Sequence, residues 1–185
     1  MSIAKPHTPK DGQLPLPDFG FDFANFNYVS RQIMFRIAEF YHVSPSVFGG
    51  DASSVPLPTR ATSGSAGYDF FTPVPIELAP GETVTVPTGI RARIAEGWVL
   101  FVLPKSGLGF RYRLRLDNTV GVIDSDYFGS DNEGHIIVKL TNCGDKPLSV
   151  KKHAPFCQGV FLPFGITESD ATDGIRNGGF GSTSK

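Results

Sequence analysis

The stretch "TVTVPTGIRARIAEGWVLFVLP", residues 83–104, holds three short runs, apolar or alternating, that are separated by proline and glycine. Each run has about the length of a strand. Further runs of this kind, also separated by turn residues, are "YRLRLD", "HIIVKL", "PLSV" and "QGVFLPF". Turn signals recur at intervals typical of sandwiches and barrels, and no helical period of useful length follows. The pattern therefore predicts an all-β body over residues 55–170, a jelly roll or β-barrel.

The composition agrees with a turn-rich β protein. The 185 residues include 21 glycines and 15 prolines, above the usual shares of about 7% and 5%. Sixteen phenylalanines stand against one tryptophan, which indicates an aromatic core. The length suits one domain with an appendage.

Net charge and hydropathy limit which ligands this protein is expected to bind and where in the cell it is expected to be. The net charge is −1 and the pI is about 6.4, so there is no basic field to hold a nucleic-acid polymer, and any nucleotide ligand should be a small molecule. The N-terminal "MSIAKPHTPKDGQLP" lacks the apolar region of a signal peptide. No apolar run approaches the roughly 20 residues of a membrane span. We expect a soluble, cytoplasmic protein without a membrane contact.

The two cysteines, Cys143 and Cys157, form no C-x-x-C pair and have no cluster of His or Cys around them. This spacing argues against a zinc site. One alternative is a disulfide between the two cysteines. The preferred interpretation is two reduced thiols in a cytosolic protein.

The sequence pattern predicts that residues 1–54 form an N-terminal extension. In "NYVSRQIMFRIAEFYHVSPSVF", Val29, Ile33, Ile37 and Tyr41 share one helical stripe, and Ser44 and Pro45 end the pattern. The spacing predicts one amphipathic helix over residues 28–42. The helix either packs its stripe on the rest of the assembly or docks another protein.

Four stretches carry residues whose side chains or backbone groups could bind a ligand or take part in a reaction. "VLPKSGLGF" (102–110) has the composition of an anion-binding turn, and "ATSGSAGYDF" (61–70) presents Asp69, a carboxylate suited to the waters of Mg²⁺. "RNGGFGSTSK" (176–185) offers a guanidinium, an aromatic ring and hydroxyls, and "GVIDSDYFG" (121–129) places two acids and a tyrosine after a buried strand. Taken singly, each signal is weak, and an ordinary turn or a polar tail is the simpler interpretation.

Taken in order, these stretches resemble one family. The segments that carry the resemblance are "SAGYD" (65–69), "PKSGLG" (104–109), "NTVGVIDSDYFG" (118–129), "FCQGVFLPF" (156–164) and "RNGGFGST" (176–183). They are similar to the five ordered motifs of trimeric dUTPase, over residues 55–185 and not over residues 1–50. The resemblance implies a β jelly roll and a homotrimer with active sites at subunit interfaces. It also implies that residues 171–185 form a mobile arm that closes over a neighbouring active site.

The resemblance implies how the uracil and the sugar are recognised. The hairpin of residues 118–123 would match the uracil edge, with Asn118 as its side-chain contact and Gly121, Val122 and Ile123 in its strand. Cytosine would leave buried polar groups unpaired, and the methyl of thymine would clash. Tyr127 would lie under the deoxyribose without room for a 2′-hydroxyl, and Phe180 would cap the uracil.

The resemblance also implies the reaction. Asp124 would orient and partly deprotonate a water that attacks the α-phosphorus of dUTP, giving dUMP and pyrophosphate. Asp69 would contact, through water, a Mg²⁺ chelated by the triphosphate. The implied phosphate-binding residues are Lys105, Ser106, Gly107, Gln158, Arg176, Gly181 and Ser182. Such an enzyme limits uracil incorporation into DNA and supplies dUMP for dTTP synthesis.

Departures from the family leave alternatives open. In "RNGGF" (176–180) the arginine is one residue closer to the glycine pair than is common in the family. The family usually has arginine where this chain has Lys105, and "FGSDNEG" (128–134) lengthens the turn after Tyr127. The longer turn is a surface loop or an extra contact with metal, arm or partner. dCTP deaminase shares the fold, but Lys139 stands where its glutamate would be. A regulatory protein that binds a partner through the extension or the 128–134 loop is the other alternative.

Overall fold

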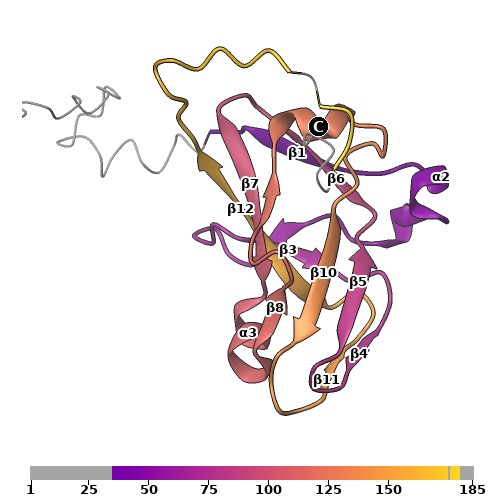
Figure 1. Cartoon of the computed structure of the whole chain (residues 1–185). Coiled ribbons are helices and arrows are strands. Elements are labelled where there is room, and N and C mark those ends of the chain that lie inside the picture. Colours follow the sequence, from indigo (N-terminus) through magenta and orange to yellow (C-terminus); the bar gives the residue numbers. More distant parts are fainter. Residues whose placement is uncertain (1–34, 175, 180–185) are drawn as a thin grey trace, which may run out of the picture. The chain divides into compact units, whose positions relative to one another are not determined.

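The computed structural model describes residues 35–174 and 176–179 (Figure 1). The chain divides into two compact units, Met1–Arg36 and Ile37–Lys185. The second unit is built mainly of short strands. In chain order these are β1 (Ala38–His42), β2 (Thr59–Arg60), β3 (Tyr68–Phe71), β4 (Ile76–Leu78), β5 (Thr83–Pro87), β6 (Ile90–Ile94), β7 (Trp98–Pro104), β8 (Leu114–Leu116), β9 (Gly121–Ile123), β10 (Ile137–Asn142), β11 (Leu148–Val150) and β12 (Pro155–Pro163).

The helices are few and short. They are α2 (Pro45–Phe48), α3 (Ser106–Tyr112) and the 3-10 helices η1 (Ala52–Ser54) and η2 (Ser125–Gly129). None of the helices in the described part of the chain is both long and apolar enough to span a membrane. The all-β prediction for the body is confirmed, and the three runs of residues 83–104 form β5, β6 and β7.

Alternation along the strands decides which side chains enter the core. In β6, Ile90, Ala92 and Ile94 are buried, whereas Arg91 and Arg93 lie on the other face. Successive side chains of a strand point to opposite faces, so this sequence can bury one face only.

The strands pair into four sheets. The largest has five strands in the order β2-β3-β12-β7-β9, and a three-stranded sheet has the order β5-β10-β8. Two further pairs are β1-β6 and β11-β4. The pairings are antiparallel throughout. The nine-residue strand β12 lies between β3 and β7 and is the longest strand among the described residues.

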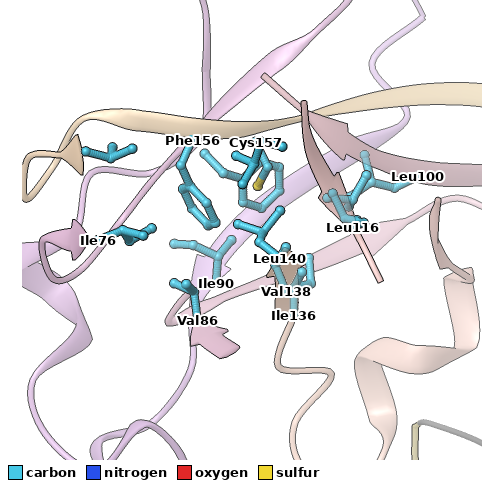
Figure 2. Packing of buried hydrophobic residues seen from close by; sticks show 14 of the residues in the cluster. Ile76, Val86, Ile90, Leu100, Leu116, Ile136, Val138, Leu140, Phe156 and Cys157 are labelled. Carbon is cyan, nitrogen blue, oxygen red and sulfur yellow. The ribbon is translucent and has the colours of Figure 1, made fainter. Parts of the chain in front are cut away.

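The core joins the sheets through apolar side chains. Figure 2 shows Phe156 and Cys157 of β12 directed toward Ile90 and Leu140 from the other sheets. Phe156, Cys157, Ile90 and Leu140 are completely buried. Because the interior is close-packed, each of these strands is held in place by its neighbours' side chains.

The helix predicted over residues 28–42 is not found in the described residues. Residues 28–34 lie outside the described part, and Ala38–His42 form strand β1, which pairs with β6 from Ala38 opposite Ile94 to His42 opposite Ile90. Of the predicted stripe only Tyr41 lies in β1, and the pairing of β1 with β6 satisfies backbone hydrogen bonds of both strands. The sheets therefore begin before residue 55.

Both cysteines are free thiols. Complete burial raises the pKa of the Cys157 thiol well above its ordinary value, so this group stays protonated and unreactive. The prediction of two reduced thiols agrees with this arrangement.

Replacing Leu140 with alanine should lower the free energy of unfolding by about 2–5 kcal/mol, because the lost side chain leaves a cavity in the core. Leu57 is 38% exposed, so Leu57→Ala is a matched control and should cost much less. Chemical denaturation of both variants measures the difference. Equal losses would contradict the position of Leu140 at the centre of the core.

Candidate functional site

Strand β9 lies at the end of the five-stranded sheet, where it pairs with β7. Gly121 is opposite Val102, and a Cβ at Gly121 would be only 3.1 Å from the Val102 Cβ. The absence of a side chain at Gly121 therefore allows the close approach of the two strands. The outer edge of β9 pairs with no other strand among the described residues, so its N–H and C=O groups are available to a ligand.

A tight turn leads into β9. Thr119 has a positive φ of 67°, and its N–H donates to the Leu116 carbonyl at 2.9 Å. The N–H of Val120 donates to the Asn118 carbonyl at 2.7 Å. These local bonds hold the turn close to β8 and place Asn118 beside the edge of β9.

A cavity of about 400 Å³ lies against this edge. Its floor is apolar and its rim carries charged and polar groups. The lining residues are Val102, Leu116, Asp117, Asn118, Val120, Gly121, Val122, Ile123, Tyr127, Ile136, Ile137, Val138, Lys139, Arg176 and Gly179. This volume lies within the range of small-molecule sites, which is about 300–1,000 Å³.

Two acids follow β9 and meet the C-terminal arm. Arg176 donates through Nη2 to Asp124 and through Nε to Asp126, the second at 2.9 Å. The side chain of Arg176 is 20% exposed, whereas those of Asp124 and Asp126 are 41% and 55% exposed. One guanidinium therefore holds the arm against both carboxylates of the same chain.

Tyr127 of η2 forms one wall of the cavity. It is 6% exposed, and the arm covers part of its ring. A Cβ at Gly179 would be 2.9 Å from the Tyr127 Oη and 3.0 Å from its Cε2. Only a glycine allows the arm to lie this close to the ring.

A second group of predicted residues gathers where β3, β12 and β7 adjoin. Gln158 of β12 pairs with Asp69 of β3 and with Leu103 of β7. The Lys105 Nζ is 2.5 Å from the Asp69 Oδ1, and the Gln158 Nε2 is 3.4 Å from the Pro104 carbonyl oxygen. Register alone thus brings together an acid, a lysine and an amide from three separate motifs.

The structure divides the predicted site residues into two groups. Asn118, Gly121, Val122, Ile123, Tyr127 and Arg176 line the cavity, and Asp124 contacts it through Arg176. The second group does not line it and consists of Asp69, Lys105, Ser106, Gly107 and Gln158. Phe180, Gly181 and Ser182 lie outside the described residues.

Sequence reasoning did not identify Asp117 as a residue of the site and considered Lys139 only as a departure from dCTP deaminase. Lys139 and Asp117 both line the cavity, and the Lys139 Nζ is 3.1 Å from the Asp117 Oδ2. Asp117 also accepts a hydrogen bond from the Thr141 hydroxyl, which is the main cause of its lowered pKa. Lys139 lies in β10 and Asp117 directly follows β8, and the Asp117 N–H donates to the Lys139 carbonyl at 3.0 Å.

The 128–134 loop packs on its own chain. The Glu133 Oε2 accepts a hydrogen bond from the Ser44 N–H at 2.8 Å, and bonding to Ser44 lowers the Glu133 pKa. His135 follows the loop, and its Nε2 accepts from the Gly89 N–H at 2.9 Å. Burial lowers the pKa of His135, in keeping with a neutral ring that accepts this bond.

Comparison with known proteins identifies the family. A model of the dUTPase family matches residues 53–184. The deoxyuridine 5'-triphosphate nucleotidohydrolase of Lactococcus lactis is 39% identical over 134 residues, which are 71% of this chain and 89% of that protein.

Solved structures extend the likeness to the fold. The dUTPase of Streptococcus mutans is 33% identical with a TM-score of 0.57, and the match covers 72% of this chain and all of that one. The Staphylococcus bacteriophage 80alpha dUTPase, solved with dUPNHPP, is 19% identical with a TM-score of 0.58 and supports the fold alone. That match covers 80% of this chain and 98% of the phage chain. The family match and the bacterial relatives show that this chain belongs to the dUTPase family, the nucleotidohydrolases of deoxyuridine 5'-triphosphate.

Proposed function

We propose that this chain hydrolyses dUTP to dUMP and pyrophosphate and that the cavity beside β9 binds the uracil and the deoxyribose. The observation that carries the proposal is the set of groups around the cavity. The edge of β9 and Tyr127 line it, and Asp124 directly follows β9 and pairs with Arg176, which also lines it. A base, a sugar and an α-phosphate would each find a suitable group there.

Selection of uracil would come from the backbone of β9 and its turn. Uracil presents an acceptor, a donor and an acceptor on one edge, and the outer edge of a strand offers both N–H and C=O groups. Cytosine would leave polar groups without partners in a largely apolar cavity, which costs about 1–3 kcal/mol per buried group. The 5-methyl group of thymine would need space next to the tight turn at Asn118.

Asp124 would act as the general base. Its carboxylate accepts a proton from a water whose oxygen attacks the α-phosphorus, while the bond to the bridging oxygen breaks and pyrophosphate leaves. In this structure Asp124 is paired with Arg176. When nucleotide binds, Arg176 would transfer to the terminal phosphate, because a triphosphate offers it more negative charge than two exposed acids do. The transfer frees Asp124 and closes the arm.

The second group would bind phosphates. Lys105 contributes a point charge, Ser106 and Gly107 contribute donors at the start of α3, and Gln158 contributes an amide. Gly181 and Ser182 would add contacts from the arm, and Phe180 would stack on the uracil. Since none of the second group lines the cavity of its own chain, a complete site would combine groups from different subunits. A homotrimer, the assembly typical of the family, would provide this.

Asp69 suits a Mg²⁺ that arrives with the nucleotide. In the described part of the chain, no three His, Cys, Asp or Glu side chains are grouped to hold a metal. A single carboxylate fits an ion that is chelated by the triphosphate and keeps several waters. When bound, Mg²⁺ supplies positive charge that neutralises the phosphates and favours one conformer. In the cell the reaction would limit uracil incorporation into DNA and supply dUMP for dTTP synthesis.

Pyrophosphate release should occur from dUTP and not from dCTP, dTTP or UTP. Each nucleotide is assayed with Mg²⁺ and with EDTA, and chelation should lower the rate. Ammonia release from dCTP is followed in parallel to test the deaminase alternative. A protein that binds dUTP but releases no pyrophosphate would refute the proposed function.

Asp124→Asn should lower kcat by about 10²–10⁴-fold, because the base is lost. Binding of dUTP should persist, because the amide preserves the shape of the side chain. Asp126→Asn is the matched control. It removes one exposed contact to Arg176, which is worth at most about 1 kcal/mol, and should change kcat by less than about tenfold. Comparable losses in both variants would mean that Asp124 has no special role.

A chain that ends at Gly174 should lose most of its dUTP turnover and keep its folded core. The truncation removes Arg176 and the rest of the arm but none of the paired strands. Steady-state kinetics and thermal unfolding of the truncated and full-length proteins measure the two effects. Full activity in the truncated chain would rule out a role for the arm.

A further inference from the structure

The hydroxyl of Tyr127 both donates and accepts a hydrogen bond, with one partner in the 128–134 loop and the other in the residue that follows it. The Tyr127 Oη donates to the His135 carbonyl at 2.9 Å and accepts from the Asn132 Nδ2 at 2.8 Å. The phenol is therefore fixed from two directions at the end that lies farthest from its backbone.

The loop orients Asn132 for this contact. The Asn132 Oδ1 accepts from the Gly134 N–H at 3.2 Å, so its Nδ2 is directed to Tyr127. Gly134 has a φ of 69°, and a Cβ there would be 2.6 Å from the Tyr127 carbonyl oxygen. A residue other than glycine would push the loop away from the tyrosine.

The loop is also anchored to strands outside the cavity. Besides Glu133 and His135, which bond to Ser44 and Gly89, the Phe128 carbonyl accepts from the Arg91 Nη2 at 2.6 Å. The Arg91 guanidinium lies 3.7 Å from the centre of the Phe128 ring. Because these partners lie on or beside β1 and β6, the loop is a fixed support for the tyrosine.

We propose that Asn132 is a positioning residue that holds the Tyr127 ring against the sugar and thereby sets the discrimination between deoxyribose and ribose. The inference rests on the proposed function, in which Tyr127 lies under the deoxyribose. Exclusion of a 2′-hydroxyl by contact depends on ring position within a few tenths of an ångström. A ring that can recede would admit ribose while still supporting deoxyribose.

The test compares kcat/KM for dUTP and UTP in the wild type, Asn132→Ala, Asn132→Leu and Tyr127→Phe. Asn132→Leu keeps a side chain of similar shape that can neither donate to nor accept from the Tyr127 hydroxyl. In all three variants the dUTP-to-UTP ratio should fall about three- to tenfold, the size of one ordinary hydrogen bond. The fall should come mainly from faster UTP turnover, which a general loss of structure would not produce.

Two controls make the result specific. Asp131→Ala changes the exposed neighbour in the same loop and should leave the ratio unchanged. Adding Asn132→Ala to Tyr127→Phe should cause no further fall, because the hydroxyl that Asn132 holds is already absent. Thermal unfolding of every variant accompanies the kinetics.

The outcomes separate the inference from the proposed function. A wild type that does not hydrolyse dUTP overturns the proposed function and the inference with it. A wild type that rejects UTP, with an unchanged ratio in folded Asn132→Ala or Asn132→Leu, overturns the inference alone. If Asn132→Ala does not fold, Asn132→Leu and Tyr127→Phe decide in the same way. An equal fall in Asp131→Ala also overturns it, because the effect would then belong to the whole loop.

Discussion

The double pairing of β12, with β3 on one side and β7 on the other, is the constraint on which the rest of the structure depends. Gly159 makes it possible. A Cβ there would be 2.7 Å from the Leu100 Cδ1 and 3.0 Å from the Phe70 Cε2, so the core side chains of both neighbours meet across the glycine. The same strand buries Phe156 and Cys157 completely. Strand pairing and core packing are thus fixed by one segment.

Both groups of the site follow from that pairing. β12 brings Gln158 beside Asp69 and the end of β7, where Lys105 begins the next turn. β7 in turn carries β9 on its free side, and the cavity lies along that strand. The two groups are consequently attached to one rigid sheet, while the contacts from Arg176 and Gly179 come from a segment without regular structure. This division would suit the proposed function, in which the supports for base and phosphate are preformed and the arm closes last.

The loop of residues 128–134 shows how an insertion becomes part of a site. By sequence it is a polar extension of a turn, and its outward residue Asp131 is exposed. In the folded chain Phe128 contacts Arg91 of β6, Glu133 contacts Ser44 after β1, and the Asn132 amide donates to Tyr127. The N-terminal strand, which has no counterpart in the family's motifs, is thereby connected to the wall of the cavity.

The sequence by itself determined the all-β class, the runs that became β5, β6 and β7, and the motifs that identify the family, because these depend on local period, turn residues and fixed spacing. The sequence did not determine that Ala38–His42 form a strand. This short segment fits the period of a helix as well as that of a strand, and only its pairing with β6 selects the strand. The contacts of Asn132 with Tyr127 and of Lys139 with Asp117 were also decided by tertiary structure alone. Each joins residues whose separation in space is set by strand register and loop closure, which local sequence does not encode.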